Sequence, residues 1–135
     1  MFPEPPPDWF RPTLEELRSL VALAKNWDSY GARPVNPHCA ASAISLLRST
    51  LEPSMPQPSI VPTSRGGIQI EWHRDGMDIE IDVQSPSRLY VAFRDENTDE
   101  AWEQQISEDL NPLASLLARL ATREWESGKR QNGQG

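Results

Sequence analysis

The chain has 135 residues, a formal net charge of −7 at pH 7 and 13 prolines. This length suits one domain with a substantial core, and the single cysteine, Cys39, excludes an internal disulfide. No apolar run approaches the roughly 18–20 residues of a membrane-spanning helix, and the N-terminus lacks the basic and apolar regions of a secretory signal, so we expect a cytoplasmic protein.

Five prolines lie in residues 1–12, and each of them fixes φ and removes a backbone donor. We therefore predict an extended Pro-rich arm over residues 1–12, with Trp9 and Phe10 pinning its end to the rest of the protein. A single domain is predicted over residues 13–126. Residues 127–135 are rich in glycine and polar side chains, which predicts a disordered tail.

Two helices are predicted before the first strand. Thr13 begins a capping box, and apolar residues then recur at helical spacing, which predicts a helix over residues 13–27. Asn36 followed by Pro37 is a typical helix start, because the asparagine side chain caps the first turn and proline suits the first position. The apolar stripe that follows predicts a second helix over residues 36–51.

The segment N-W-D-S-Y-G-A, residues 26–32, separates these two helices. Gly31 is the natural position for a positive φ, and the Asp28 carboxylate can accept hydrogen bonds from nearby backbone amides. The sequence allows two interpretations of Trp27. In the first it is a core residue beneath a structural loop, and in the second it is part of a surface recognition loop. We favour the structural interpretation and predict that Trp27 is buried.

Residues 66–83 contain the clearest pattern in the chain, two alternating runs joined by Asp75-Gly76. Alternation with a period of two predicts two strands, each with an apolar and a polar face, and Asp-Gly favours a two-residue type I′ turn. That turn sets a register with apolar pairs on one face and polar pairs on the other. The apolar pairs are Trp72–Ile79, Ile70–Ile81 and Ile68–Val83, and the polar pairs are His73–Asp78, Glu71–Glu80 and Gln69–Asp82.

Further strands are predicted on both sides of this hairpin. Residues 59–63 are predicted to form a short strand, and Pro62 restricts that strand to an edge of the sheet. A further strand is predicted over residues 88–94. Residues 101–106 fit a fifth strand, although their alternation pattern is weaker. A third helix is predicted over residues 108–126. The predicted fold class is therefore α+β, an antiparallel β-meander of four to five strands with three helices on one face, in the order α-α-β-β-β-β-(β)-α.

The negative charge is concentrated in the sheet half of the chain. Residues 71–109 hold twelve acidic residues against three arginines, a net charge of −9, whereas the remaining residues carry +2. Such an acidic surface argues against direct nucleic-acid binding. Two interpretations of the acidic residues stay open. In the first they form a solvated sheet face, and in the second they form a surface that attracts a basic protein. For the second interpretation, the predicted partner-binding residues are Glu71, Asp78, Glu80 and Asp82, with Tyr90 and Trp102 as aromatic anchors.

Two segments, NWDSYGA at residues 26–32 and GGIQIEW at residues 66–72, resemble those of a set of small, uncharacterised bacterial proteins. Those proteins carry N-W-D-x-x-G-A, a following proline and later G-G-I-x-x-E-W. The resemblance implies a bacterial origin and a compact domain, and it implies no activity. The motif residues to which we assign a structural role are Trp27, Asp28, Gly31, Gly66, Gly67 and Trp72.

Side chains suited to catalysis are few and poorly placed. Cys39 follows His38, but neighbouring helix residues point about 100° apart and do not form a dyad. Glu71 and Glu80 face one another, yet on a flat and wet surface that offers neither a pocket nor a wrapped metal site. No G-x-x-x-x-G-K-[ST], H-E-x-x-H or C-x-x-C motif occurs. We therefore expect no cofactor, no metal and no catalytic residue.

The favoured function is a non-enzymatic bacterial binding protein that acts by stoichiometric association, such as an antitoxin, an immunity protein or an inhibitor. We expect its partner to be a protein with a basic surface. Two alternatives stay open. One is a metal- or carboxylate-assisted hydrolase that uses Glu71, Asp78 and Glu80, and the other is a scaffold subunit that docks through its Pro-rich arm.

Overall fold

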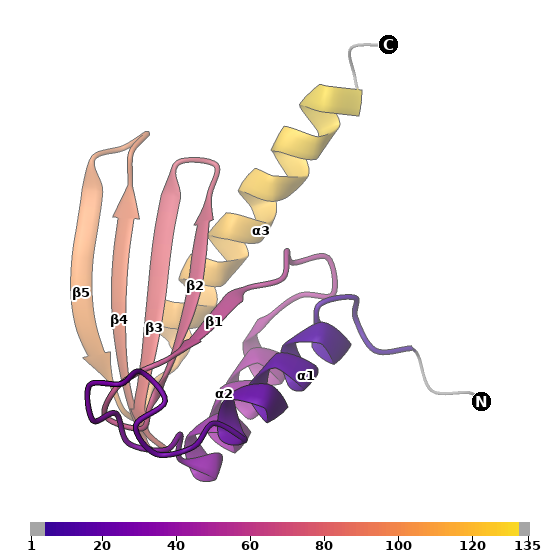
Figure 1. The fold of residues 1–135 in the computed structure, drawn as a ribbon. Helices are drawn as coiled ribbons and strands as arrows, with labels where there is room; N and C mark the ends of the chain where they lie inside the picture. The colour runs from indigo at the N-terminus through magenta and orange to yellow at the C-terminus, as the bar shows by residue number, and fades with distance from the viewer. Residues whose placement is uncertain (1–4, 133–135) are drawn as a thin grey trace.

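The computed structural model describes residues 5–132, which fold into three helices and one five-stranded sheet (Figure 1). The sheet is an antiparallel meander in which each strand pairs with the next along the chain. The α+β class is therefore confirmed, and the fifth strand is present. In chain order the elements are α1 (Phe10–Val21), α2 (Pro37–Thr50), β1 (Ser59–Pro62), β2 (Ile68–Arg74), β3 (Met77–Ser85), β4 (Arg88–Asp95), β5 (Glu100–Ile106) and α3 (Asn111–Asn132).

The β2–β3 hairpin has the predicted register. Asp75 and Gly76 have φ values of 51° and 77°, as a type I′ turn requires at both of its central positions. Trp72 pairs with Ile79 on one face, and Glu71 pairs with Glu80 on the other. Because side chains alternate along a strand, this one turn decides which residues of both strands face the core.

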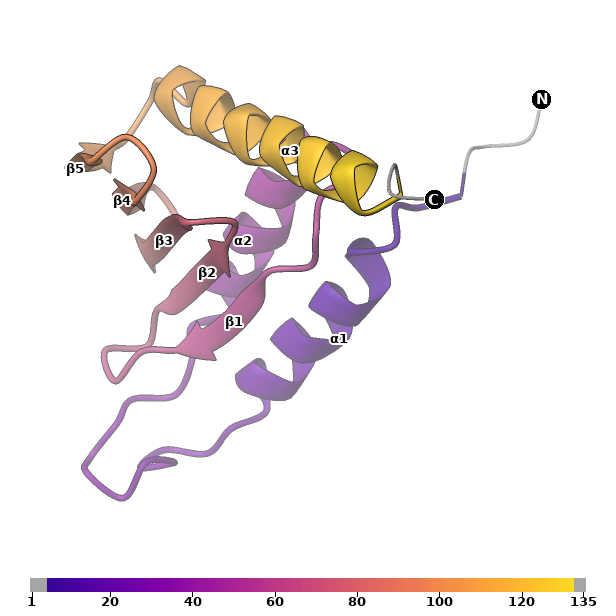
Figure 2. The same ribbon diagram turned by 90° about the horizontal axis from the view of Figure 1, so that it is seen from above.

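All three helices lie on one face of the sheet (Figure 2). Helix α1 packs against β1 and α2, while α2 packs against β2, β3 and α3. The Trp72 side chain is buried beneath them, and its indole N–H donates to the Pro56 carbonyl oxygen at 2.9 Å. The buried apolar residues of the three central strands are Ile68, Ile70, Trp72, Met77, Ile79, Ile81, Val83, Leu89, Val91 and Phe93. None of the helices within residues 5–132 combines the length and the apolar character needed to cross a membrane.

The first helix begins earlier and ends earlier than predicted. It starts at Phe10, so Thr13 is a buried residue inside the helix rather than its N-cap. Pro12 is tolerated there because the backbone N–H groups of a first helical turn have no intrahelical partner. Trp9 is only 2% exposed, and its indole N–H donates to the Glu52 carbonyl oxygen at 3.2 Å. The predicted boundary of the Pro-rich arm at residue 12 is therefore wrong, and residues 1–4 of that arm lie outside the described residues.

The last helix extends beyond its predicted end. Helix α3 starts at Asn111, whose backbone N–H donates to the Asp109 carboxylate at 2.9 Å. It continues to Asn132, so the predicted tail is wrong for residues 127–132, and residues 133–135 lie outside the described residues. The physical reason is that a single glycine costs a helix only about 1 kcal/mol, and the surrounding residues are mostly good helix formers.

The 26–32 loop is closed by its own side chains, and Trp27 is not in the core. The Asp28 carboxylate accepts the backbone N–H groups of Tyr30 and Ala32 at 2.9 and 3.0 Å. The Asn26 side chain accepts the Gly31 N–H, and Gly31 has the expected positive φ of 86°. Trp27 is only partly buried, and its indole N–H donates to the Arg33 carbonyl oxygen. The prediction that Trp27 is a core residue was wrong, because its indole closes a surface loop instead.

The two segments that carry the bacterial resemblance meet in space. The N–H of Arg33, the residue directly after the first segment, donates to the Ser64 carbonyl oxygen at 3.0 Å, and the Asn36 N–H donates to the carbonyl oxygen of Gly66, the first residue of the second segment, at 2.8 Å. Gly66 has a φ of +89°, and a Cβ atom on Gly67 would lie 2.7 Å from the Val83 carbonyl oxygen. Both glycines are therefore required by the backbone, which gives this pair of segments a structural role.

Candidate functional site

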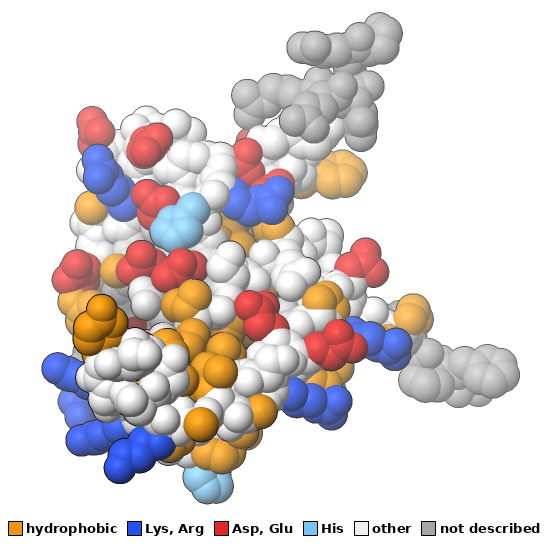
Figure 3. All heavy atoms as spheres, viewed as in Figure 1, with side chains coloured by type: hydrophobic (Ala, Val, Ile, Leu, Met, Phe, Trp, Pro, Cys, Tyr) orange, Lys and Arg blue, Asp and Glu red, His pale blue; other side chains and the backbone are white. Residues whose placement is uncertain are grey.

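The face of the sheet opposite the helices carries the candidate site. Residues that are paired across antiparallel strands share a face, so the register defines three polar rows that cross the sheet. Figure 3 shows acidic side chains gathered over the strands beside a histidine. The rows are His73–Asp78–Arg94–Ala101, Ser59–Glu71–Glu80–Ala92–Glu103 and Val61–Gln69–Asp82–Tyr90–Gln105.

Charge on this open face is unbalanced. Four of the predicted partner-binding residues, all acidic, lie on it: Glu71, Asp78, Glu80 and Asp82. Glu103 of β5 adds a fifth carboxylate, which the sequence patterns did not single out. Within the described part of the chain, the positive side chains on this face are Arg94, the ionisable His73 and Arg88, which pairs with Ser85 at the end of the sheet. The face is therefore acidic in the folded protein. Five further acids of the 71–109 segment lie in turns and loops, whereas Asp95 and Glu100 lie on the face that the helices cover.

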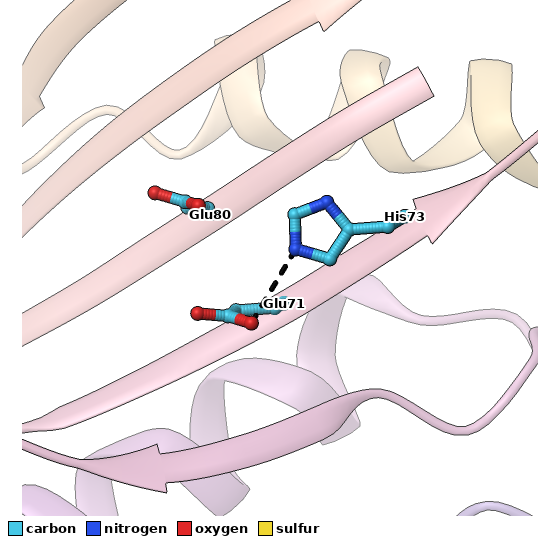
Figure 4. A group of neighbouring side chains, drawn as sticks. All are labelled: Glu71, His73 and Glu80. Atoms are coloured by element: carbon cyan, nitrogen blue, oxygen red, sulfur yellow. Dashed lines mark hydrogen bonds and ion pairs between the residues drawn. The ribbon is translucent and has the colours of Figure 1, made fainter. Parts of the chain in front are cut away.

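A compact cluster occupies the centre of this face. Glu71 and His73 project from β2 and Glu80 projects from β3, all toward the same side of the sheet (Figure 4). One potential ligand atom from each of the three side chains lies within 4.8 Å of the others. His73 Nε2 is 3.4 Å from Glu71 Oε2, and His73 Nδ1 is 2.7 Å from Asp78 Oδ1. The histidine is thus held between two carboxylates.

These carboxylates alter the protonation of the histidine. The hydrogen bond with Asp78 raises the pKa of His73 above its ordinary value, and Glu71 acts in the same direction. The protonated ring is stabilised by both neighbours, so this contribution to stability is complete below the ordinary histidine pKa and is lost as the pH rises through the folded-state pKa. Sequence reasoning predicted the His73–Asp78 pairing but did not assign His73 to the site.

An open hollow adjoins the cluster toward β5. It has a volume of about 500 Å³, and the small side chain of Ala92 lies between Glu80 and Glu103 in the middle row. An alanine between longer neighbours leaves such a depression on a sheet surface. The lining residues are His73, Asp78, Glu80, Ala92, Phe93, Arg94 and residues 101–103.

The two predicted aromatic anchors lie on opposite faces of the sheet. Tyr90 lies on the open face, where its hydroxyl donates to the Glu103 carboxylate. Trp102 pairs with Phe93, with ring centroids 5.6 Å apart, so its side chain is on the face that the helices cover. The placement of Trp102 beside the acidic residues was therefore wrong. Its strand has a weak alternation pattern, from which the face of each residue could not be read.

A second cluster was missed by the sequence analysis and lies between the sheet and α3. Asp95 is fully buried, with Oδ2 2.8 Å from both Arg119 Nη2 and Arg123 Nη2. Hydrogen bonds from Arg123 hold the pKa of the Asp95 carboxyl far below its usual range, with further contributions from the Asn97 backbone N–H and Arg119. In the sequence Asp95 was only one of the twelve acidic residues of the 71–109 segment, and its burial was not predicted. The overlooked signal was a pair of arginines at i and i+4 on α3, a spacing that places both side chains on one face of that helix.

Cys39 and His38 stay separate in the structure. The Cys39 thiol is buried, and burial raises its pKa, whereas the adjacent His38 is exposed on α2. A buried thiol with a raised pKa is a poor nucleophile.

Comparison of the chain with family models, with curated proteins and with solved structures gave no match.

Proposed function

We propose that this protein is a binding module that associates with a basic protein partner through the open face of its sheet. The observation that supports this proposal is the set of five carboxylates on a sheet face opposite all three helices. A face with one dominant sign of charge raises the rate at which an oppositely charged partner arrives, and it also selects against acidic partners.

The surface also offers features that suit a protein side chain. The hollow beside Glu80 can accept a lysine or arginine side chain, which would then meet carboxylates on two sides. Tyr90, on the same face, supplies an aromatic surface of the kind that often contributes most to binding. By contrast, Trp9 is buried in the protein's own core, so the end of the Pro-rich arm is already docked on this chain. The open face is therefore a better docking site than the arm.

Reversing three charges on this face is expected to slow association at least about tenfold at low ionic strength. The variant carries Glu71→Lys, Glu80→Lys and Asp82→Lys, and its unfolding midpoint should change little because these side chains point away from the core. The difference should fade above about 0.5 M salt, where the Debye length falls to a few ångströms. The measurement is the association rate against ionic strength, with a partner first isolated by affinity capture.

The matched control carries the same change of net charge at exposed positions away from the sheet, namely Asp8→Lys, Glu15→Lys and Glu52→Lys. It should associate at nearly the wild-type rate. Equal rates and equal salt slopes for all three proteins would contradict the proposal. Loss of a hydrolytic turnover in the first variant, with association unchanged, would instead favour the carboxylate-assisted hydrolase.

The 26–32 loop is a second candidate surface. Tyr30 is 92% exposed, although the loop that presents it is closed by hydrogen bonds that the Asn26 and Asp28 side chains accept and that the Trp27 indole donates. A rigid loop loses little conformational entropy when its exposed aromatic residue binds. If a partner uses this loop, Tyr30→Ala should weaken affinity by about tenfold or more without changing the unfolding midpoint. Unchanged affinity, measured by titration calorimetry, would exclude the loop and leave the sheet face.

A further inference from the structure

We propose that Glu71, His73 and Glu80 form a binding site for one divalent transition-metal ion of the zinc type. The expectation of no metal site considered only carboxylates along a strand, and it left out the histidine that lies among them. This inference goes beyond the docking proposal and does not depend on it, because the ligands all come from this chain.

The spacing of the three side chains suits a small ion. Zinc binds imidazole nitrogen and carboxylate oxygen at about 2.0–2.2 Å, so two ligands of one tetrahedral ion lie roughly 3.3–3.5 Å apart. His73 Nε2 and Glu71 Oε2 are already 3.4 Å apart. One carboxylate oxygen of Glu80 lies within 4.8 Å of a ligand atom of each of the other two side chains, so a modest side-chain rotation would close the set. The backbone needs no movement, because the register of β2 and β3 places the three residues together.

Neighbouring side chains orient two of the ligands. When Nδ1 of His73 donates its proton to Asp78, Nε2 presents its lone pair toward Glu71 and Glu80. A carboxylate on the far side of a metal-binding histidine is the usual supporting arrangement in zinc sites. The Gln69 side chain donates to Glu80 Oε2 at 3.1 Å and so restrains the second glutamate. Each of these contacts would hold a ligand ready before the ion arrives.

Charge and ligand type indicate the class of ion. Glu71 and Glu80 are directly opposite one another, where two like charges repel, and a divalent ion between them would remove that repulsion. An imidazole ligand favours zinc, cobalt, nickel or copper, whereas magnesium and calcium prefer oxygen ligands alone. Three protein ligands leave a fourth position of a tetrahedral ion open to water or to a group from another molecule.

The test is a calorimetric titration of the metal-stripped protein with Zn²⁺ at neutral pH. The wild type should bind one ion per chain, and His73→Gln and Glu80→Gln should each weaken the affinity at least about tenfold. Asp78→Asn should weaken it by roughly tenfold, as loss of a supporting carboxylate does. A second readout is the visible absorption of bound Co²⁺, which should be lost in His73→Gln.

Two variants serve as matched controls. His38→Gln removes an exposed histidine from α2, and Glu103→Gln removes a carboxylate from the same face but outside the cluster. Both should bind Zn²⁺ with wild-type affinity. Absence of saturation at about 1 mM Zn²⁺, or equal affinity of wild type and His73→Gln, would overturn the proposal. Such a failure would leave the docking proposal intact, because the charge-reversal experiment is carried out without added metal.

Discussion

Replacing Asp95 with asparagine is expected to lower the free energy of unfolding by about 3 kcal/mol, the lower end of the range for breaking a buried ion pair. Asp95 is 0% exposed and accepts hydrogen bonds from both Arg119 and Arg123, which join α3 to the end of β4. Asparagine keeps the shape but not the negative charge, so two guanidinium groups lose their common partner. Both arginines keep some access to water, which limits the cost. Chemical denaturation at pH 7 measures the change.

The pH dependence of this effect has a definite sign. The pKa of Asp95 is lowered by folding, so its stabilising contribution is present above the ordinary aspartate pKa of about 4 and is lost as the pH falls below it. The difference in stability between wild type and Asp95→Asn should therefore be smaller at pH 3 than at pH 7. The control is Glu96→Gln, an exposed acid in the turn directly after Asp95, which should change stability by less than about 0.5 kcal/mol. A pH-independent difference would show that the lost ion pair is not the cause.

Truncating Trp9 to alanine is expected to cost about 3–5 kcal/mol, the usual range for a large buried aromatic residue. Trp9 is 2% exposed, packs with Phe10 and donates its indole N–H to the carbonyl oxygen of Glu52. Its loss removes the contact that fixes the start of α1 to the connector after α2. The measurement is the free energy of unfolding from urea denaturation, with tryptophan fluorescence and circular dichroism as independent probes.

Trp27→Ala provides the matched comparison, because it makes the same chemical change at a partly exposed position. Trp27 contributes mainly the hydrogen bond to the Arg33 carbonyl oxygen, so its truncation should cost only about 1 kcal/mol. Equal losses for the two variants would mean that Trp27 stabilises the protein as strongly as a core residue. A small loss for Trp9→Ala would mean that the N-terminal contact contributes little.

Local chemistry by itself determined the central part of this fold. Asp75-Gly76 specifies a tight turn, and strict alternation on both sides of it sets the register and the faces of β2 and β3. Asn36-Pro37 likewise specifies the start of α2, where the Asn36 side chain accepts the His38 N–H. These features depend on residues that are close in sequence, so the pairing of Glu71 with Glu80 and of His73 with Asp78 could be predicted.

Only the tertiary structure decided the features that depend on distant residues. Both Trp9 and Trp27 flank the first helix, and nothing local shows that Trp9 enters the core by packing beside the connector after α2. Asp95 ends one strand, and its partners lie on α3, 24 and 28 residues later, so its burial depends on where that helix docks. The metal site lies between these two cases. The locally specified register brings Glu71, His73 and Glu80 to one face, but the direction of the His73 ring is set by side-chain contacts that the alternation pattern does not report. Sequence pattern reports which face of an element is apolar, whereas the choice of partner across the core depends on packing that no short segment contains.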